Sequence, residues 1–118
     1  KDWWISDFTA IYNHVPASLT VECIADSTII EFNAQQLEEI FVQFPEFESY
    51  QRKNLERHIV SLNKRILNQL QLTALDRYRL FLEQYPDIEQ SISNYHIASY
   101  LGMTQQSLSR VRAEMAKI

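Results

Sequence analysis

The sequence is poor in glycine, proline and cysteine and lacks any long apolar run. Its 118 residues include one glycine, three prolines and one cysteine. Cys23 cannot form an internal disulfide or supply the four thiolates of a typical iron–sulfur cluster, and its alternating apolar neighbours predict a buried side chain. Because no apolar run reaches about 18 residues and no basic-then-apolar N-terminus is present, we expect no membrane span, no signal peptide and a cytoplasmic protein.

Catalytic and metal-binding patterns are also missing. His14, His58 and His96 are far apart in the sequence, and no cysteine and histidine spacing resembles a metal site. The sequence shows no recognisable pattern that pairs a nucleophile with a general base. The sequence therefore predicts a protein that is not an enzyme and has no cofactor and no metal.

The net charge of −4 is distributed unevenly along the chain. Residues 1–48 carry one cation and nine anions, whereas residues 49–72 carry five cations and one anion. Residues 73–92 are again acidic, and residues 93–118 carry three cations and one anion. Because charges farther apart than about 10 Å are largely screened at cellular salt, a basic C-terminal part can still attract phosphates.

The first third of the chain has the composition of β-strands. Apolar residues alternate with polar ones over 19–23, and after the turn-forming Ala25-Asp26-Ser27 a second strand-like run follows at 28–32. Two or three strands do not form a stable sheet unaided, so we expect further strands before Lys1, in agreement with the missing initiator methionine.

Helix patterns follow. Asn33 and Gln36 predict a capping box for a helix that ends at Pro45, and Thr73 with Asp76 predicts a helix that ends before Pro86. Between them, 46–72 contains no glycine or proline and suits one long helix. Apolar residues spaced 4, 3 and 4 apart predict a coiled-coil seam that joins two copies of the chain: Leu55, Ile59, Leu62 and Ile66.

Two short helices are predicted at 94–101 and 105–117. Ala98 permits a close helix crossing, Gly102 suits the positive φ of the turn, and Thr104 can cap the second helix. A helical wheel turns inward Leu108, Val111 and Met115, turns outward Gln106, Ser109, Arg110, Ala113 and Lys117, and leaves on the flank Gln105 and Arg112. Taken alone, the pair also fits a helical hairpin inside a bundle.

The motifs Thr-Ala-Leu-Asp-Arg-Tyr (73–78) and Tyr-His-Ile-Ala-Ser-Tyr-Leu-Gly-Met-Thr-Gln-Gln-Ser-Leu-Ser-Arg-Val-Arg (95–112) resemble the C-terminal part of Crp/Fnr-family bacterial transcription regulators, especially the Bacteroidetes type. The resemblance implies an α+β chain: the end of a cyclic-nucleotide-binding β-roll sensor domain (1–44), a dimerisation helix (45–72) and a helix-turn-helix domain (73–118). It implies a homodimer on double-stranded DNA. With the helical wheel, it predicts these DNA-binding residues: Thr104, Gln105, Gln106, Ser109, Arg110 and Lys117.

The effector pocket that the resemblance implies departs from the family pattern. Family members have Gly-Glu and Arg-Ser or Arg-Thr there, and the arginine pairs with the cyclic phosphate. The corresponding positions here are Ser6-Asp7 and Ala17-Ser18. Without that arginine we expect no response to cyclic AMP, and an unknown small-molecule effector stays open.

An alternative hypothesis is that the chain is a ligand-sensing or protein-interaction module whose helix-turn-helix no longer binds DNA. The acidic net charge favours this alternative slightly. The outward Arg110 and Lys117 favour the DNA-binding regulator.

Overall fold

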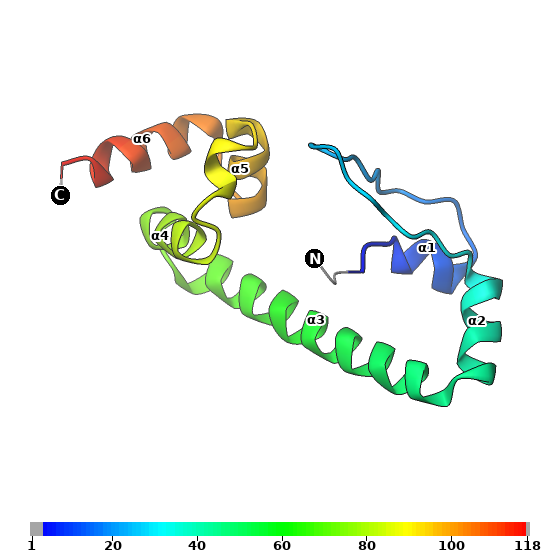
Figure 1. Cartoon of the computed structure of the whole chain (residues 1–118). Helices are drawn as coiled ribbons and strands as arrows, with labels where there is room; N and C mark the ends of the chain where they lie inside the picture. Colours follow the sequence, from blue (N-terminus) through cyan, green and yellow to red (C-terminus); the bar gives the residue numbers. More distant parts are fainter. Residues whose placement is uncertain (1–3, 118) are drawn as a thin grey trace. The chain divides into compact units, whose positions relative to one another are not determined.

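A computed structural model describes residues 4–117 (Figure 1). Six α-helices and one short 3₁₀ helix follow one another in this part: α1 (Phe8–Asn13), α2 (Ala34–Gln43), α3 (Pro45–Gln71), α4 (Ala74–Gln84), η1 (Ile88–Gln90), α5 (Asn94–Leu101) and α6 (Gln105–Met115). The chain divides into two compact units, the first up to Gln51 and the second from Arg52 onward. No described helix is both long enough and apolar enough to span a bilayer.

The predicted α+β class is wrong, since residues 4–117 contain helices and no strand. The strands predicted at 19–23 and 28–32 lie in a stretch without regular structure, so the β-roll end predicted for 1–44 is not found in 4–44. Alternation predicts a strand only where one face is buried and the backbone is paired. Here Leu19 is 65% exposed and Ile30 is 81% exposed, and Cys23 is exposed rather than buried as predicted.

The first unit is organised by aromatic rings rather than by a buried apolar core. Trp4 stacks on Phe32 with ring centroids 5.9 Å apart and also contacts Phe47 at 6.1 Å. Phe47 in turn lies 5.8 Å from Phe41 and 6.0 Å from Tyr50. Among residues 4–51 no apolar side chain is fully buried. The aromatic cluster thus joins the extended segment to α2 and to the start of α3.

Local sequence signals set the helix boundaries. The capping box predicted at Asn33 and Gln36 is confirmed, because the side chain of each accepts a hydrogen bond from the backbone of the other. The Thr73 hydroxyl accepts a hydrogen bond from the Asp76 amide at 3.2 Å, which confirms the predicted start of α4. Each cap satisfies an amide that the first turn of a helix leaves unpaired.

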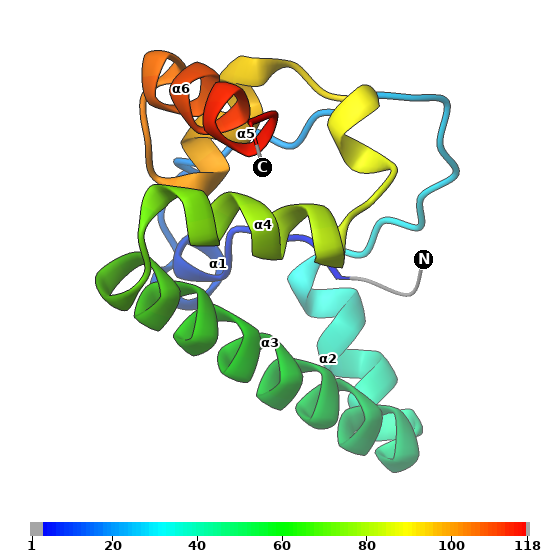
Figure 2. The ribbon, with the colours of Figure 1, turned by 90° about the vertical axis from the view of Figure 1, so that its left-hand side faces the viewer.

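The second unit has a buried core made by α4, α5 and α6 (Figure 2). Each helix contributes apolar side chains that are at least nine-tenths buried: Tyr78 and Phe81 from α4, Ile97, Ala98 and Leu101 from α5, and Leu108 and Val111 from α6. Burying an aliphatic side chain stabilises a fold by about 1.5–3 kcal/mol. The core therefore holds α6 firmly against α4 and α5.

Candidate nucleic-acid interface

The turn between α5 and α6 depends on the single glycine of the chain. Gly102 has φ of 65°, in the left-handed region, and the amides of Gly102 and Met103 donate hydrogen bonds to the carbonyls of Ser99 and Ala98. A side chain at Gly102 would also meet the Gln69 amide group, 3.2 Å from the position of a Cβ atom. The predicted role of Gly102 in the turn is confirmed.

Thr104 starts α6 as predicted from the sequence. Its hydroxyl accepts a hydrogen bond from the Ser107 amide at 3.1 Å and lies 3.1 Å from the Ser107 hydroxyl. The predicted inward stripe of α6 is confirmed as well, because Leu108 and Val111 are buried and Met115 packs on the core. The cap and the stripe fix which side of α6 faces outward.

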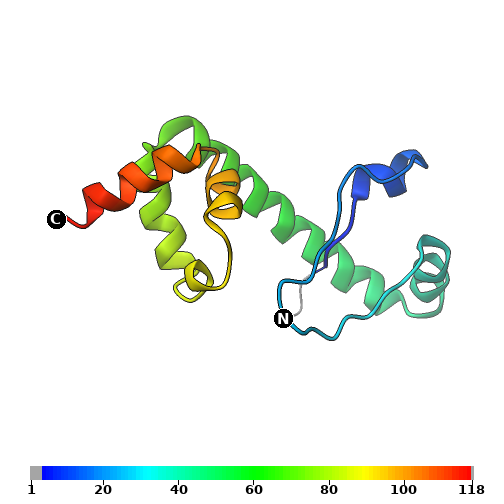
Figure 3. The same ribbon diagram turned by 90° about the horizontal axis from the view of Figure 1, so that it is seen from above.

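The outward face of α6 combines small, amide and basic side chains. Six residues that the helical wheel places there or on its edge are exposed: Gln105, Gln106, Ser109, Arg110, Ala113 and Lys117. Within residues 4–117, Arg110 and Lys117 form no ion pair. Figure 3 shows α6 running along one side of its unit, with its last turn projecting beyond α4 and α5. α6 ends at Met115, short of the Lys117 predicted from the sequence. The outward face of the helix thus carries Arg110, while the exposed Glu114 is on its last turn and Lys117 lies in the turn that follows.

Arg112, placed on the flank of this face by the helical wheel, points back into the unit. Its guanidinium lies 2.7 Å from the Glu89 carboxylate and donates hydrogen bonds to the Tyr78 hydroxyl at 3.0 Å and to the Asn94 side-chain oxygen at 2.7 Å. Tyr78 completes the cluster by donating to Glu89. These contacts tie α6 to α4, to η1 and to the start of α5, and they neutralise the charge of Arg112.

The same cluster shifts the acid–base properties of its members. Burial, followed by the hydrogen bond to Glu89, raises the pKa of the Tyr78 hydroxyl. For Arg112, burial alone would lower the pKa, but the hydrogen bonds to Tyr78 and Glu89 outweigh it and raise the pKa. Tyr78 and Arg112 therefore both keep their protons near neutral pH. The neutral tyrosine hydroxyl lies between the Arg112 guanidinium and the Glu89 side chain.

Arg77 on α4 contacts the ends of two other helices. It donates to the carbonyls of Leu72 at 2.8 Å and Gln69 at 3.4 Å, at the end of α3, and to the carbonyl of Leu101 at 3.1 Å, at the end of α5. No role for Arg77 was predicted from the sequence. The sequence shows its charge, but its carbonyl partners lie up to 24 residues away, so no local sequence pattern identifies them.

The predicted dimerisation residues lie on one exposed stripe of α3 within the second unit. Leu55 is 37% exposed, Ile59 56%, Leu62 41% and Ile66 54%. Each of the four side chains leaves a third or more of its surface uncovered in the single chain. The stripe is thus open to a partner.

The structure brings together two of the four predicted effector-pocket residues. The Asp7 carboxylate accepts hydrogen bonds from the Ser18 amide at 2.9 Å, the Ser18 hydroxyl at 3.2 Å and the Leu19 amide at 3.2 Å, while its other oxygen caps α1. Amide donors, led by that of Ala10, lower the pKa of Asp7. Ser6 and Ala17 are the chain neighbours of this pair. The carboxylate therefore already occupies the amides that could otherwise hold an anion.

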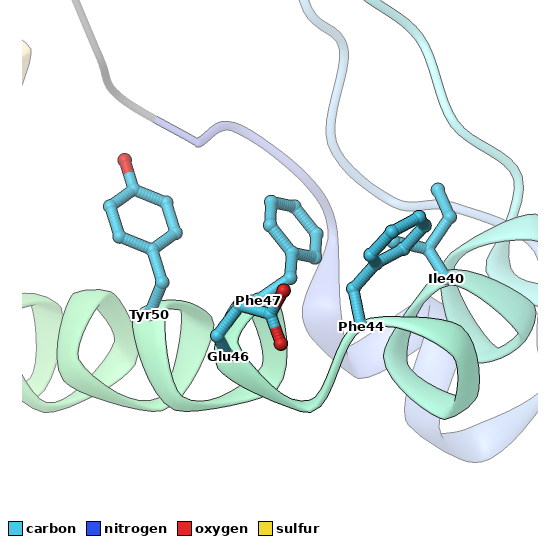
Figure 4. A pocket seen from close by; sticks show the side chains of 5 residues that line it. All are labelled: Ile40, Phe44, Glu46, Phe47 and Tyr50. Carbon is cyan, nitrogen blue, oxygen red and sulfur yellow. The ribbon is translucent and has the colours of Figure 1, made fainter.

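A hollow of about 380 Å³ lies elsewhere in the first unit (Figure 4). Side chains of α2, of the α2–α3 junction and of the first turns of α3 line it: Ile40, Phe44, Glu46, Phe47 and Tyr50. None of the four predicted effector residues contributes to it. In the described part of the chain, no group of three or more histidine, cysteine or acidic side chains is arranged to hold a metal ion.

Comparisons with protein-family models, with curated proteins and with solved structures give no match for this chain. The resemblance to Crp/Fnr regulators therefore rests on the residues of the chain alone and stays a prediction.

Proposed function

We propose that the chain is a sequence-specific DNA-binding transcription regulator that acts as a homodimer and presents α6 to the major groove. The observation that carries the proposal is the outward face of α6, which has small side chains, amides and the exposed Arg110 on a helix held by a buried core, with Lys117 in the turn that follows. With 11 residues, α6 is about 16 Å long. An α-helix with its side chains is about 10–12 Å in diameter, which fits a major groove about 12 Å wide.

The distribution of charge supports this proposal despite the acidic total. Arg112 is neutralised by Glu89, so the exposed charges of α6 and of the turn after it are the cations Arg110 and Lys117 and the anion Glu114. All nine anions of residues 1–48 belong to the first unit, whereas α6 belongs to the second. Phosphate attraction acts over about a Debye length, roughly 8 Å at physiological salt, so it depends on the charges close to α6, where cations outnumber anions by two to one.

The exposed stripe of α3 supports a dimer. Leu55 and Leu62 alternate with Ile59 and Ile66 along the stripe. β-Branched residues at one seam position and leucine at the other favour two parallel helices over larger assemblies. A parallel pair would present two copies of α6, as needed for two half-sites about 34–36 Å apart.

The contacts of Asp7 support a regulator that does not respond to cyclic AMP. A cyclic phosphate at Ser18 would have to displace the bonded carboxylate and would gain no arginine in return. A protein with this function would work in the cytoplasm, where bacterial DNA lies. An effector of another kind stays open.

A second candidate is a ligand-sensing or protein-interaction module without DNA affinity, favoured by the net charge of −4 and by the aromatic hollow beside Phe47. Retention of the purified chain on immobilised random duplex DNA, measured against salt, separates the two functions. The regulator should elute earlier as salt rises, with a slope that reflects several phosphate contacts. Passage through the column unretained at low salt, together with no enriched sequence after selection from random DNA, would support the second candidate.

A further inference from the structure

The contact between α3 and the three helices that follow it is built differently from the core of those helices. The buried cluster is formed by side chains of α4, α5 and α6, and no described α3 residue belongs to it. Polar contacts connect α3 instead. Arg65 lies 4.2 Å from the centre of the Tyr100 ring and donates to the Tyr100 carbonyl at 3.2 Å, and the Gln69 side chain lies against Gly102.

Arg77 is the residue that joins both sides of this contact at once. Its three acceptors are the carbonyls of Gln69 and Leu72 at the end of α3 and of Leu101 at the end of α5. The last carbonyls of a helix have no partner within it and carry the negative end of its dipole. One guanidinium therefore satisfies the ends of two helices, and its planar fork fixes the angle between them.

We propose that Arg77 is a positioning residue that fixes the direction of α6 relative to α3, and that it thereby sets which separation of two DNA half-sites the dimer accepts. This inference rests on the proposed function. The seam on α3 relates the two copies to each other, while α6 meets the bases. Any loosening between α3 and α5 would therefore change the distance and the angle between the two copies of α6.

The inference predicts a specific effect on spacing. Each added base pair moves a half-site by about 3.4 Å and turns it by about a tenth of a helical turn. If Arg77 fixes the angle between α3 and α5, the dimer should bind poorly when the spacer is changed by one base pair. If that contact is loose, the dimer should still bind. Hydrogen bonds from a charged group are worth about tenfold or more in an equilibrium constant. We therefore expect Arg77→Ala to lower the discrimination between adjacent spacer lengths by about tenfold.

The test is selection from a duplex library in which two copies of the preferred half-site are separated by spacers of varied length. Arg77→Ala should broaden the spacer optimum while keeping the base preference within each half-site and the dimeric mass. Arg79→Ala is the matched control, because it removes an equal charge from the same helix and its partner Asp76 is also on α4. If Arg77 only stabilised the fold, Arg77→Ala would lower the melting temperature and leave the spacer optimum sharp.

A second variant and a second measurement cover the case in which Arg77→Ala does not fold. Arg77→Lys keeps the charge but cannot bridge carbonyls from two helix ends, so it should broaden the optimum too. Distances between spin labels on Ala113→Cys, in a Cys23→Ser background, report the separation of the two α6 copies without DNA. Both Arg77 variants should widen that distance distribution.

The outcomes separate the two proposals. A wild-type chain that selects no DNA would contradict the proposed function, and the spin-label distances would still decide the role of Arg77. A wild-type spacer optimum that Arg77→Ala or Arg77→Lys retains at full sharpness would overturn this inference and leave the proposed function standing.

Discussion

Arg112 of α6 and Glu89 of η1 form an ion pair with 2.7 Å between nitrogen and oxygen, and each side chain is less than one-third exposed. The pair orients α6 because Arg112 lies on the side of the helix that faces Tyr78 and Asn94. Arg112, at the edge of the candidate interface, thus forms its contacts within the second unit.

Glu89→Gln should therefore destabilise the second unit. The substitution removes the charge that compensates Arg112 and weakens a charge-assisted hydrogen bond, which costs about 1–3 kcal/mol. Urea unfolding measures the loss. Glu83→Gln, an exposed glutamate on α4, is the control and should change stability by less than about 0.5 kcal/mol. Equal stability of the two variants would show that the ion pair contributes nothing.

Gly102→Ala should destabilise the turn between α5 and α6. A non-glycine residue in the left-handed region costs about 1–2 kcal/mol, and the new Cβ atom must also displace the Gln69 amide. Thermal unfolding of Gly102→Ala in the presence and absence of Gln69→Ala separates the two causes. The double variant should regain the stability that the contact with Gln69 costs. It should still lack the stability that the left-handed backbone costs. A wild-type melting temperature for Gly102→Ala would contradict the turn described above.

Asp7 should make the first unit sensitive to acid. Because its hydrogen bonds lower the folded-state pKa of Asp7 below 3.8, the ordinary value of an aspartate, they stabilise the fold above that pH. The contribution is lost as pH falls through the lowered pKa. An NMR titration of the Asp7 carboxyl should give a midpoint below 3.8, and Asp7→Asn should remove this part of the pH dependence of unfolding. Asp26→Asn, an exposed residue in the same unit, serves as the control. A midpoint at or above 3.8 would contradict the bonding described for Asp7.

Glu at the centre of the α3 stripe should separate the proposed dimer into single chains. Ile59→Glu with Leu62→Glu places like charges at the seam, so light scattering should fall from twice the 14.0 kDa chain mass to one chain mass. Ser61→Glu with Gln71→Glu introduces the same charge at exposed positions off the stripe and should leave the dimer intact. If the seam variant keeps the dimeric mass, the two copies associate through another surface.

The sequence predicted the helices where the signals were local. Asn33, Thr73, Gly102 and Thr104 act within a few residues of themselves, and their roles follow from side-chain chemistry and positive φ. The strands at 19–23 and 28–32 were predicted wrongly because alternation describes one segment, whereas a strand also needs a partner. The second unit needs no such pairing, since its helices satisfy their own backbones.

Parts of the candidate interface could not be predicted for a related reason. Arg112 and Tyr78 are 34 residues apart, so no spacing rule connects them, and a helical wheel could place Arg112 only at the edge of the outward face. The exposed face itself was predictable because one buried stripe, Leu108 and Val111, determines it. Charge alone did not distinguish Arg110, which is exposed, from Arg112, which turns inward.

Selection from random duplex DNA by paired variants tests whether the outward face of α6 reads DNA sequence. Arginine can bond bidentately to guanine, so Arg110→Ala should weaken the preferred site by about 1–3 kcal/mol and relax the preference at one base pair in each half-site. Lys117→Ala should instead weaken all sequences alike and reduce the salt slope by about one per lost phosphate contact. If Arg110→Ala selects the same site as the wild-type chain with the same preference at every position, the outward face of α6 does not read the bases as proposed.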